Sequence, residues 1–70
     1  MDNRLKLLRT ERRYSQQKVA MDLSLSQNSI SRYESGVRGL DAQMLCRFAD
    51  YYGVSVDYIL GRTDNPNMNK

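Results

Sequence analysis

A polar stretch between Ser26 and Gly36 holds the side chains with the most definite chemistry in this chain of 70 residues. At about 100° per residue, a helix over this stretch turns Ile30 and Tyr33 toward one side. The opposite side gathers hydrogen-bonding side chains, namely Asn28, Ser31, Arg32 and Ser35. Gln and Asn amides can pair with adenine, Arg with guanine, and Ser with a base or a phosphate. A helix that only faces solvent is more often rich in Glu and Lys, so this pattern favours the recognition of bases.

The side chains on which most enzyme active sites depend are missing or isolated. The chain has no histidine, which leaves no imidazole acid or base, no Ser–His or Cys–His pair and no zinc site that uses histidine. Residues 15–18 match the S-x-x-K pattern of penicillin-binding proteins, but the companion S-D-N and K-T-G sequences do not occur. So short a chain also leaves little room for a deep cleft. We therefore predict that the protein is not an enzyme and needs no metal, cofactor or small-molecule ligand.

Cys46 is the single cysteine, so no disulfide can form within the chain. It falls in an apolar run from Met44 to Phe48, which predicts a buried, reduced thiol rather than a reactive one. No apolar stretch approaches the roughly 18 residues of a membrane span, and the N-terminus leads into no signal-peptide run. These features predict a cytoplasmic protein without a membrane segment.

Positive charge is concentrated in the N-terminal half of the sequence. Residues 1–38 contain eight basic and four acidic side chains, whereas residues 39–70 contain three basic and four acidic ones. A localised positive field attracts polyanions, of which nucleic acid is the commonest. On charge alone, an equally good interpretation is that the basic run from Arg4 to Arg13 is only a solvated helix face.

Caps and apolar spacing predict an all-α domain of five helices over residues 1–61. The first helix covers residues 3–13, with Asp2 as its N-cap. The next four start after Ser15, Ser26, Asp41 and Ser55, and the last three of these end at Gly36, Gly53 and Gly61. Residues 62–70 are polar, contain Asn-Pro-Asn, and are predicted to form a tail.

Apolar residues at helical spacing identify the side that each predicted helix buries. The candidate core positions are Leu5, Leu8, Val19, Ala20, Leu23, Ile30, Tyr33, Leu45, Phe48, Ala49, Tyr52, Ile59 and Leu60. A short turn at residues 24–25 separates the second helix from the third. Two short helices joined in this way have the geometry of a helix-turn-helix, whose second helix enters the DNA major groove.

Three segments together resemble a known family: residues 15–20 (SQQKVA), residues 26–36 (SQNSISRYESG) and residues 48–61 (FADYYGVSVDYILG). With matching spacing over residues 4–61, the sequence closely resembles the Cro/C1-type (XRE) helix-turn-helix repressors of bacteria and phages. The resemblance implies a five-helix, lambda-repressor-like DNA-binding domain. It also implies a transcriptional repressor that binds a pseudo-palindromic operator as a homodimer.

The resemblance also implies roles for individual residues. The family's base-reading positions correspond to Gln27, Asn28 and Arg32, with Ser31 as a secondary base contact. The expected phosphate contacts are Gln16, which also braces the recognition helix, together with Ser29, Arg38 and Ser15. A partly buried ion pair is expected between Arg9 and Glu34. The candidate dimer interface is the C-terminal helix region, represented by Tyr51, Tyr52, Val56, Ile59 and Leu60.

Two positions depart from the family pattern. Ser24 stands where the turn usually has glycine, so a side chain that adopts positive φ less readily must form the turn. Leu40 stands where many members have proline. A second function class also remains open, in which a helix-turn-helix-like module of the antitoxin or anti-repressor kind regulates a partner protein without binding DNA.

Overall fold

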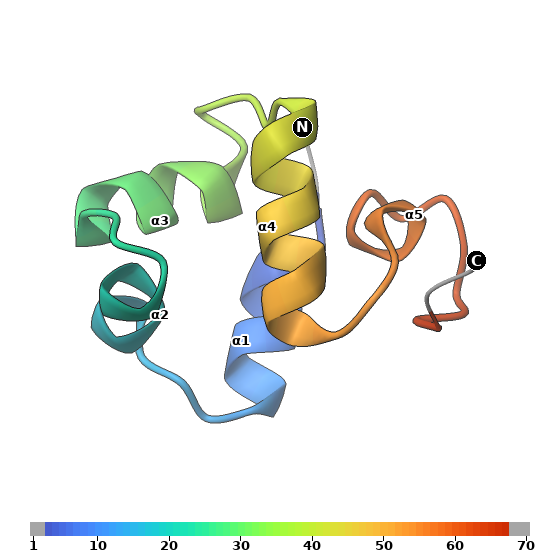
Figure 1. Ribbon diagram of the computed structural model, residues 1–70, viewed down its shortest axis with the longest axis horizontal. Helices are drawn as coiled ribbons and strands as arrows, with labels where there is room; N and C mark the ends of the chain where they lie inside the picture. Colours follow the sequence, from blue (N-terminus) through green and yellow to red (C-terminus); the bar gives the residue numbers. More distant parts are fainter. Residues whose placement is uncertain (1–2, 68–70) are drawn as a thin grey trace.

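The structure, a computed structural model, describes residues 3–67 and contains five helices and no strand within that range. They are α1 (Leu5–Glu11), α2 (Gln16–Asp22), α3 (Gln27–Ser35), α4 (Ala42–Tyr52) and α5 (Val56–Ile59). The longest helix, α4, runs through the middle of the molecule (Figure 1). The α2–α3 pair lies on one side of α4, and α5 lies on the other (Figure 1). The expected all-α class and helix order are confirmed.

Four helices begin at the predicted N-caps. Ser15, Ser26, Asp41 and Ser55 each accept a hydrogen bond from the backbone N–H three residues later, at 3.0, 3.1, 2.8 and 3.0 Å respectively. Gly36 and Gly53 cap the C-termini of α3 and α4 in the left-handed conformation, with φ of 82° and 68°. Capping depends on a few adjacent residues, which explains why the sequence locates these boundaries well.

The first helix is shorter than the range 3–13 predicted from the sequence. Asn3 precedes α1, and its side-chain oxygen accepts a hydrogen bond from the Leu5 N–H at 3.0 Å. The proposed cap Asp2 lies outside the described residues. At the other end, Arg13 has a φ of 57°, a left-handed conformation that cannot continue the helix.

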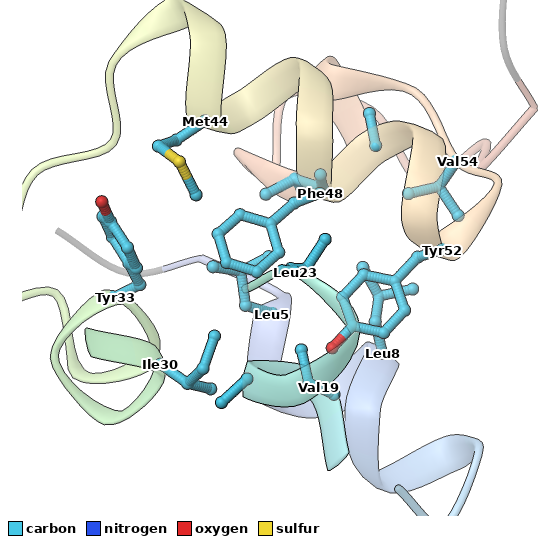
Figure 2. Packing of buried hydrophobic residues seen from close by; sticks show 13 residues of the cluster. Leu5, Leu8, Val19, Leu23, Ile30, Tyr33, Met44, Phe48, Tyr52 and Val54 are labelled. Carbon is cyan, nitrogen blue, oxygen red and sulfur yellow. The ribbon is translucent and has the colours of Figure 1, made fainter. Parts of the chain in front are cut away.

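One apolar cluster joins all five helices (Figure 2). It contains the buried residues Leu5, Leu8, Val19, Ala20, Leu23, Ile30, Tyr33, Met44, Phe48, Ala49, Tyr52, Val54 and Ile59. The Phe48 ring lies at its centre, edge-on to Tyr33 at 5.7 Å and stacked with Tyr52 at 6.4 Å between ring centroids. Most predicted core positions are confirmed, but Met44 is buried on α4 where Leu45 was expected, and both Leu45 and Leu60 are only half-buried.

The expectation of a buried thiol at Cys46 is wrong, because this side chain is exposed. Met44 and Phe48 both face the core. A position two residues from each lies about 200° around the helix from both, on the solvent side.

The C-terminal segment after α5 is fastened to the domain over residues 62–67, although the sequence suggested a simple polar tail. Arg4 donates hydrogen bonds to the Thr63 carbonyl at 2.6 Å and to the Asp64 carboxylate at 2.8 Å. The Ser55 N–H donates to the Pro66 carbonyl at 3.0 Å. The last part of the predicted tail, residues 68–70, lies outside the described residues.

Candidate nucleic-acid interface

A tight turn joins α2 to α3 and sets the angle between them. Ser24 occupies the left-handed region, with a φ of 57°. Two backbone hydrogen bonds close the turn: the Ser24 N–H donates to the Met21 carbonyl at 3.2 Å, and the Leu25 N–H donates to the Ala20 carbonyl at 2.8 Å. Ser24 therefore forms the turn that glycine usually forms. Its left-handed backbone conformation costs about 1 to 2 kcal/mol, because serine has a Cβ atom.

The two sides of α3 differ as the helical wheel predicts. Ile30 and Tyr33 are buried. The predicted base-reading residues Gln27, Asn28, Ser31 and Arg32 are all exposed. Their side chains make no hydrogen bond or ion pair within residues 3–67. The structure thus brings these four side chains together on one surface, where they can bind an external ligand. We call the exposed side of α3 the outer face.

The predicted phosphate-contacting residues differ in their exposure and in their internal contacts. Ser15 is exposed, and its hydroxyl caps α2. Ser29 is half-buried, with its hydroxyl 3.0 Å from that of Ser26. Arg38 is exposed, and its guanidinium carbon lies 5.0 Å from the centre of the Tyr33 ring. Gln16 is half-buried, and its amide nitrogen donates to Glu34 Oε1 at 3.2 Å.

An ion pair anchors α3 from its inner side. Arg9 donates to both oxygens of Glu34, from Nε to Oε2 at 2.7 Å and from Nη2 to Oε1 at 3.2 Å. Only 12% of the Arg9 side chain and 5% of the Glu34 side chain are exposed. A third guanidinium nitrogen of Arg9 donates to the Tyr14 carbonyl at 2.9 Å. Together with the Gln16 contact, this pair ties α1, the start of α2 and the end of α3 into one unit.

Many cations of the basic N-terminal half are occupied by internal contacts. Arg4, Arg9 and Lys18 pair with carboxylates, and Arg12 donates to the carbonyls of Leu8 and Tyr52. Within residues 3–67, the cations without an internal acceptor or aromatic partner are Lys6, Arg13 and Arg32. Fewer basic side chains are therefore free to form new contacts with a polyanion than the eight counted in the sequence.

Lys6 is a further candidate for a phosphate contact, which the sequence alone did not indicate. It lines a hollow of about 300 Å³ together with Gln16, Ser31, Glu34 and Ser35. The hollow lies beside the outer face and contains one of the predicted phosphate contacts. Lys6 precedes Arg9 by three residues on α1, a spacing that places the two on one side of the helix. The expected Arg9–Glu34 pair was therefore the signal that could have located Lys6 next to α3.

Residues 5–59 match the sequence model of a family described as helix-turn-helix. The chain belongs to the Cro/C1-type helix-turn-helix family. Its helix-turn-helix consists of α2 and α3, and the match covers all five helices.

The chain is similar to three regulators of Bacillus subtilis (strain 168). It is 33% identical to the HTH-type transcriptional regulator ImmR over 70 residues, which is all of this chain and 55% of the relative. It is 37% identical over 60 residues to the SPbeta prophage-derived uncharacterized HTH-type transcriptional regulator YonR, covering 86% of this chain and 56% of the relative. The uncharacterized HTH-type transcriptional regulator YobD is 34% identical over 64 residues, covering 91% of this chain and 57% of the relative. The chain spans little more than half the length of these relatives.

The predicted dimer interface of this helix-turn-helix domain needs correction at two residues. Tyr52 and Ile59 belong to the hydrophobic core, with 4% and 0% of their surface exposed, so they cannot contact a second chain directly. Burial also raises the pKa of Tyr52 to about 12. Val56 and Leu60 are half-buried and retain exposed surface, while the hydroxyl of half-buried Tyr51 donates to Asp22. The helical spacing of these residues therefore identifies the side that packs into the core, and not a surface for a second chain.

Across residues 3–67, no group of three or more Cys, Asp or Glu side chains could hold a metal ion. No helix in that range is long and apolar enough to span a membrane.

Proposed function

We propose that this protein binds double-stranded DNA of defined sequence and acts as a transcriptional regulator, most simply a repressor that occupies an operator. The observation that supports this best is the outer face of α3, where the side chains of Gln27, Asn28, Ser31 and Arg32 are exposed and make no hydrogen bond or ion pair within residues 3–67. Its membership in a helix-turn-helix family, and relatives named as transcriptional regulators, support the same function. This family consists of DNA-binding proteins rather than enzymes.

In this proposal the interface divides into base contacts and backbone contacts. Gln27, Asn28, Ser31 and Arg32 contact base edges in the major groove and supply discrimination. Contacts from Gln16, Ser29, Arg38 and Ser15 to phosphates set the register, and Lys6 joins this group. Lys6 lines a hollow together with Ser31, and the Arg38 N–H donates to the Arg32 carbonyl at 3.2 Å, so each of these exposed cations lies near a base-reading residue, which agrees with this division.

We also propose a homodimer in the cytoplasm, without a small-molecule ligand. A single recognition helix contacts few base pairs, whereas two copies contact half-sites about 34 Å apart and gain selectivity. Of the three predicted residues that keep exposed surface, we propose Val56 and Leu60 for the dimer contact, because the Tyr51 hydroxyl already donates to Asp22. The helix α5, which begins at Val56 and ends just before Leu60, lies on the opposite side of α4 from α3, so dimerisation through this region leaves α3 available (Figure 1).

Selection of bound sequences from a random pool of DNA duplexes tests this function. We expect an enriched sequence with two related half-sites, and binding that weakens with salt at a logarithmic slope of about 0.9 per phosphate contact. A control variant, Arg62→Met, removes an exposed cation outside the proposed DNA interface and should enrich the same sequence. A pool without any enriched sequence would contradict the proposal and favour a module that binds a partner protein.

A further inference from the structure

Two side chains of α4 hold the end of α2, immediately before the turn that leads into α3. Arg47 Nη2 donates to the Leu23 carbonyl at 2.5 Å. The Tyr51 hydroxyl donates to Asp22 Oδ2 at 2.5 Å. Both acceptors belong to the last residues before Ser24, so these two contacts connect the turn to the central helix of the domain. We call this pair of contacts the α4 clamp.

The turn needs such support because its conformation is strained. Ser24 adopts a φ of 57° without the freedom of glycine. The Leu23 carbonyl is one of the terminal carbonyls of α2, which lack partners within the helix. A guanidinium at this end satisfies that carbonyl and interacts favourably with the negative end of the helix dipole. Arg47 therefore stabilises the turn at the point where serine weakens it.

The second contact of the α4 clamp, between Tyr51 and Asp22, is supported by neighbouring side chains. The Asp22 carboxylate also accepts from Lys18 at 2.8 Å, and these two hydrogen bonds hold its pKa below the ordinary value. Burial and the contact with Asp22 raise the pKa of Tyr51, so its hydroxyl stays protonated and remains a donor. The Tyr51 ring also lies 6.2 Å from the Tyr14 ring, next to the start of α2. One α4 residue thus touches both ends of the α2 segment.

We propose that Arg47 and Tyr51 are positioning residues for DNA recognition, which fix the direction of α3 by holding the α2–α3 turn against α4. This inference depends on the DNA-binding function proposed above. It predicts a selective effect, because paired hydrogen bonds to a base tolerate little displacement, whereas charge attraction to phosphates is less directional. Loosening the clamp should therefore weaken binding to the selected sequence more than binding to unrelated DNA.

The test uses Tyr51→Phe, Arg47→Met and the double variant. Tyr51→Phe removes only the hydroxyl, and Arg47→Met keeps an unbranched side chain while removing the donor. Arg62→Met is the matched control, because it removes an exposed cation that is not part of the clamp. All variants are compared at a temperature at which melting curves show them fully folded, and ultracentrifugation checks that their oligomeric state matches the wild type.

Dissociation constants are measured for the selected operator and for an unrelated duplex. We expect the double variant to lose about tenfold in operator affinity, equivalent to weakening one base contact, with the unrelated duplex changed by less than about twofold. The salt slope should stay at the wild-type value, and amide exchange at Ser24 and Leu25 should accelerate. Arg62→Met should leave the operator preference and the amide exchange unchanged.

Three results would overturn this inference. Unchanged operator affinity in the double variant would show that the clamp does not position α3. Equal losses on both duplexes would show a general defect rather than positioning. A salt slope reduced by about 0.9 would identify Arg47 as a phosphate contact instead. Failure of the proposed function itself gives a different result, since the wild-type protein would then select no sequence.

Discussion

The inner and outer sides of α3 have opposite relations to the rest of the protein. On the inner side, Ile30 and Tyr33 pack in the core, and Glu34 is held by Arg9 and Gln16. On the outer face, the side chains of Asn28 and Arg32 make no hydrogen bond or ion pair within the described residues. One nine-residue helix thus separates the residues that stabilise the fold from those available for binding. Substitutions on the two sides should therefore change different measurable quantities.

The largest expected effect is on the inner side, from Glu34→Gln. Because the Arg9 side chain is only 12% exposed, losing the carboxylate leaves a charge that water reaches poorly. Breaking a buried pair costs about 3 to 5 kcal/mol in the free energy of unfolding. For a domain of this size that lowers the melting temperature by more than about 12 °C.

Thermal melts of wild type, Glu34→Gln and Glu11→Gln measure this effect. Glu11 is exposed and unpaired among residues 3–67, so Glu11→Gln provides the matched loss of a carboxylate and should melt close to the wild type. Equal melting temperatures of Glu34→Gln and Glu11→Gln would contradict the claim that the ion pair on the inner side of α3 stabilises the fold.

The next effect is on the outer face, from Arg32→Ala. Loss of one good base contact should weaken operator binding by about 1 to 3 kcal/mol and relax the preference at one guanine. Stability should change little, because the exposed Arg32 side chain makes no hydrogen bond, ion pair or aromatic contact within the described residues. Titrations over operators substituted one base pair at a time measure the preference. An equal loss on every operator would assign Arg32 to the phosphate backbone.

The smallest effect concerns Asp22 at the α4 clamp and appears as a pH dependence. Hydrogen bonds from Lys18 and Tyr51 hold the pKa of the Asp22 carboxyl below its ordinary value. The resulting stabilisation is present above the unfolded pKa of about 3.9 and is lost as pH falls through the lower, folded pKa. Melting temperatures of wild type and Asp22→Asn should therefore converge below about pH 4. A difference that persists unchanged at lower pH would contradict a contribution from the charged carboxylate.

The sequence predicts best those features that depend on neighbouring residues. Ser26 and Asp41 cap their helices as expected, and the two sides of α3 follow from helical periodicity. Cys46 was misassigned because hydropathy describes a segment, whereas exposure depends on which side of α4 faces the core. The Arg47 contact with the Leu23 carbonyl could not be predicted, because it depends on how closely α4 approaches the turn. The family resemblance, by contrast, anticipated the Arg9–Glu34 contact across 25 positions.

The central claim is that DNA contacts the outer face of α3, and a titration of the labelled protein with its selected duplex tests it most directly. Backbone amide chemical shifts should change most at Gln27, Asn28, Ser31 and Arg32, with smaller changes at Gln16 and Arg38. The amides of α5 should respond mainly to dimerisation, which a concentration series without DNA measures separately. Shift changes centred on α5, with the amides of α3 unaffected, would contradict the account.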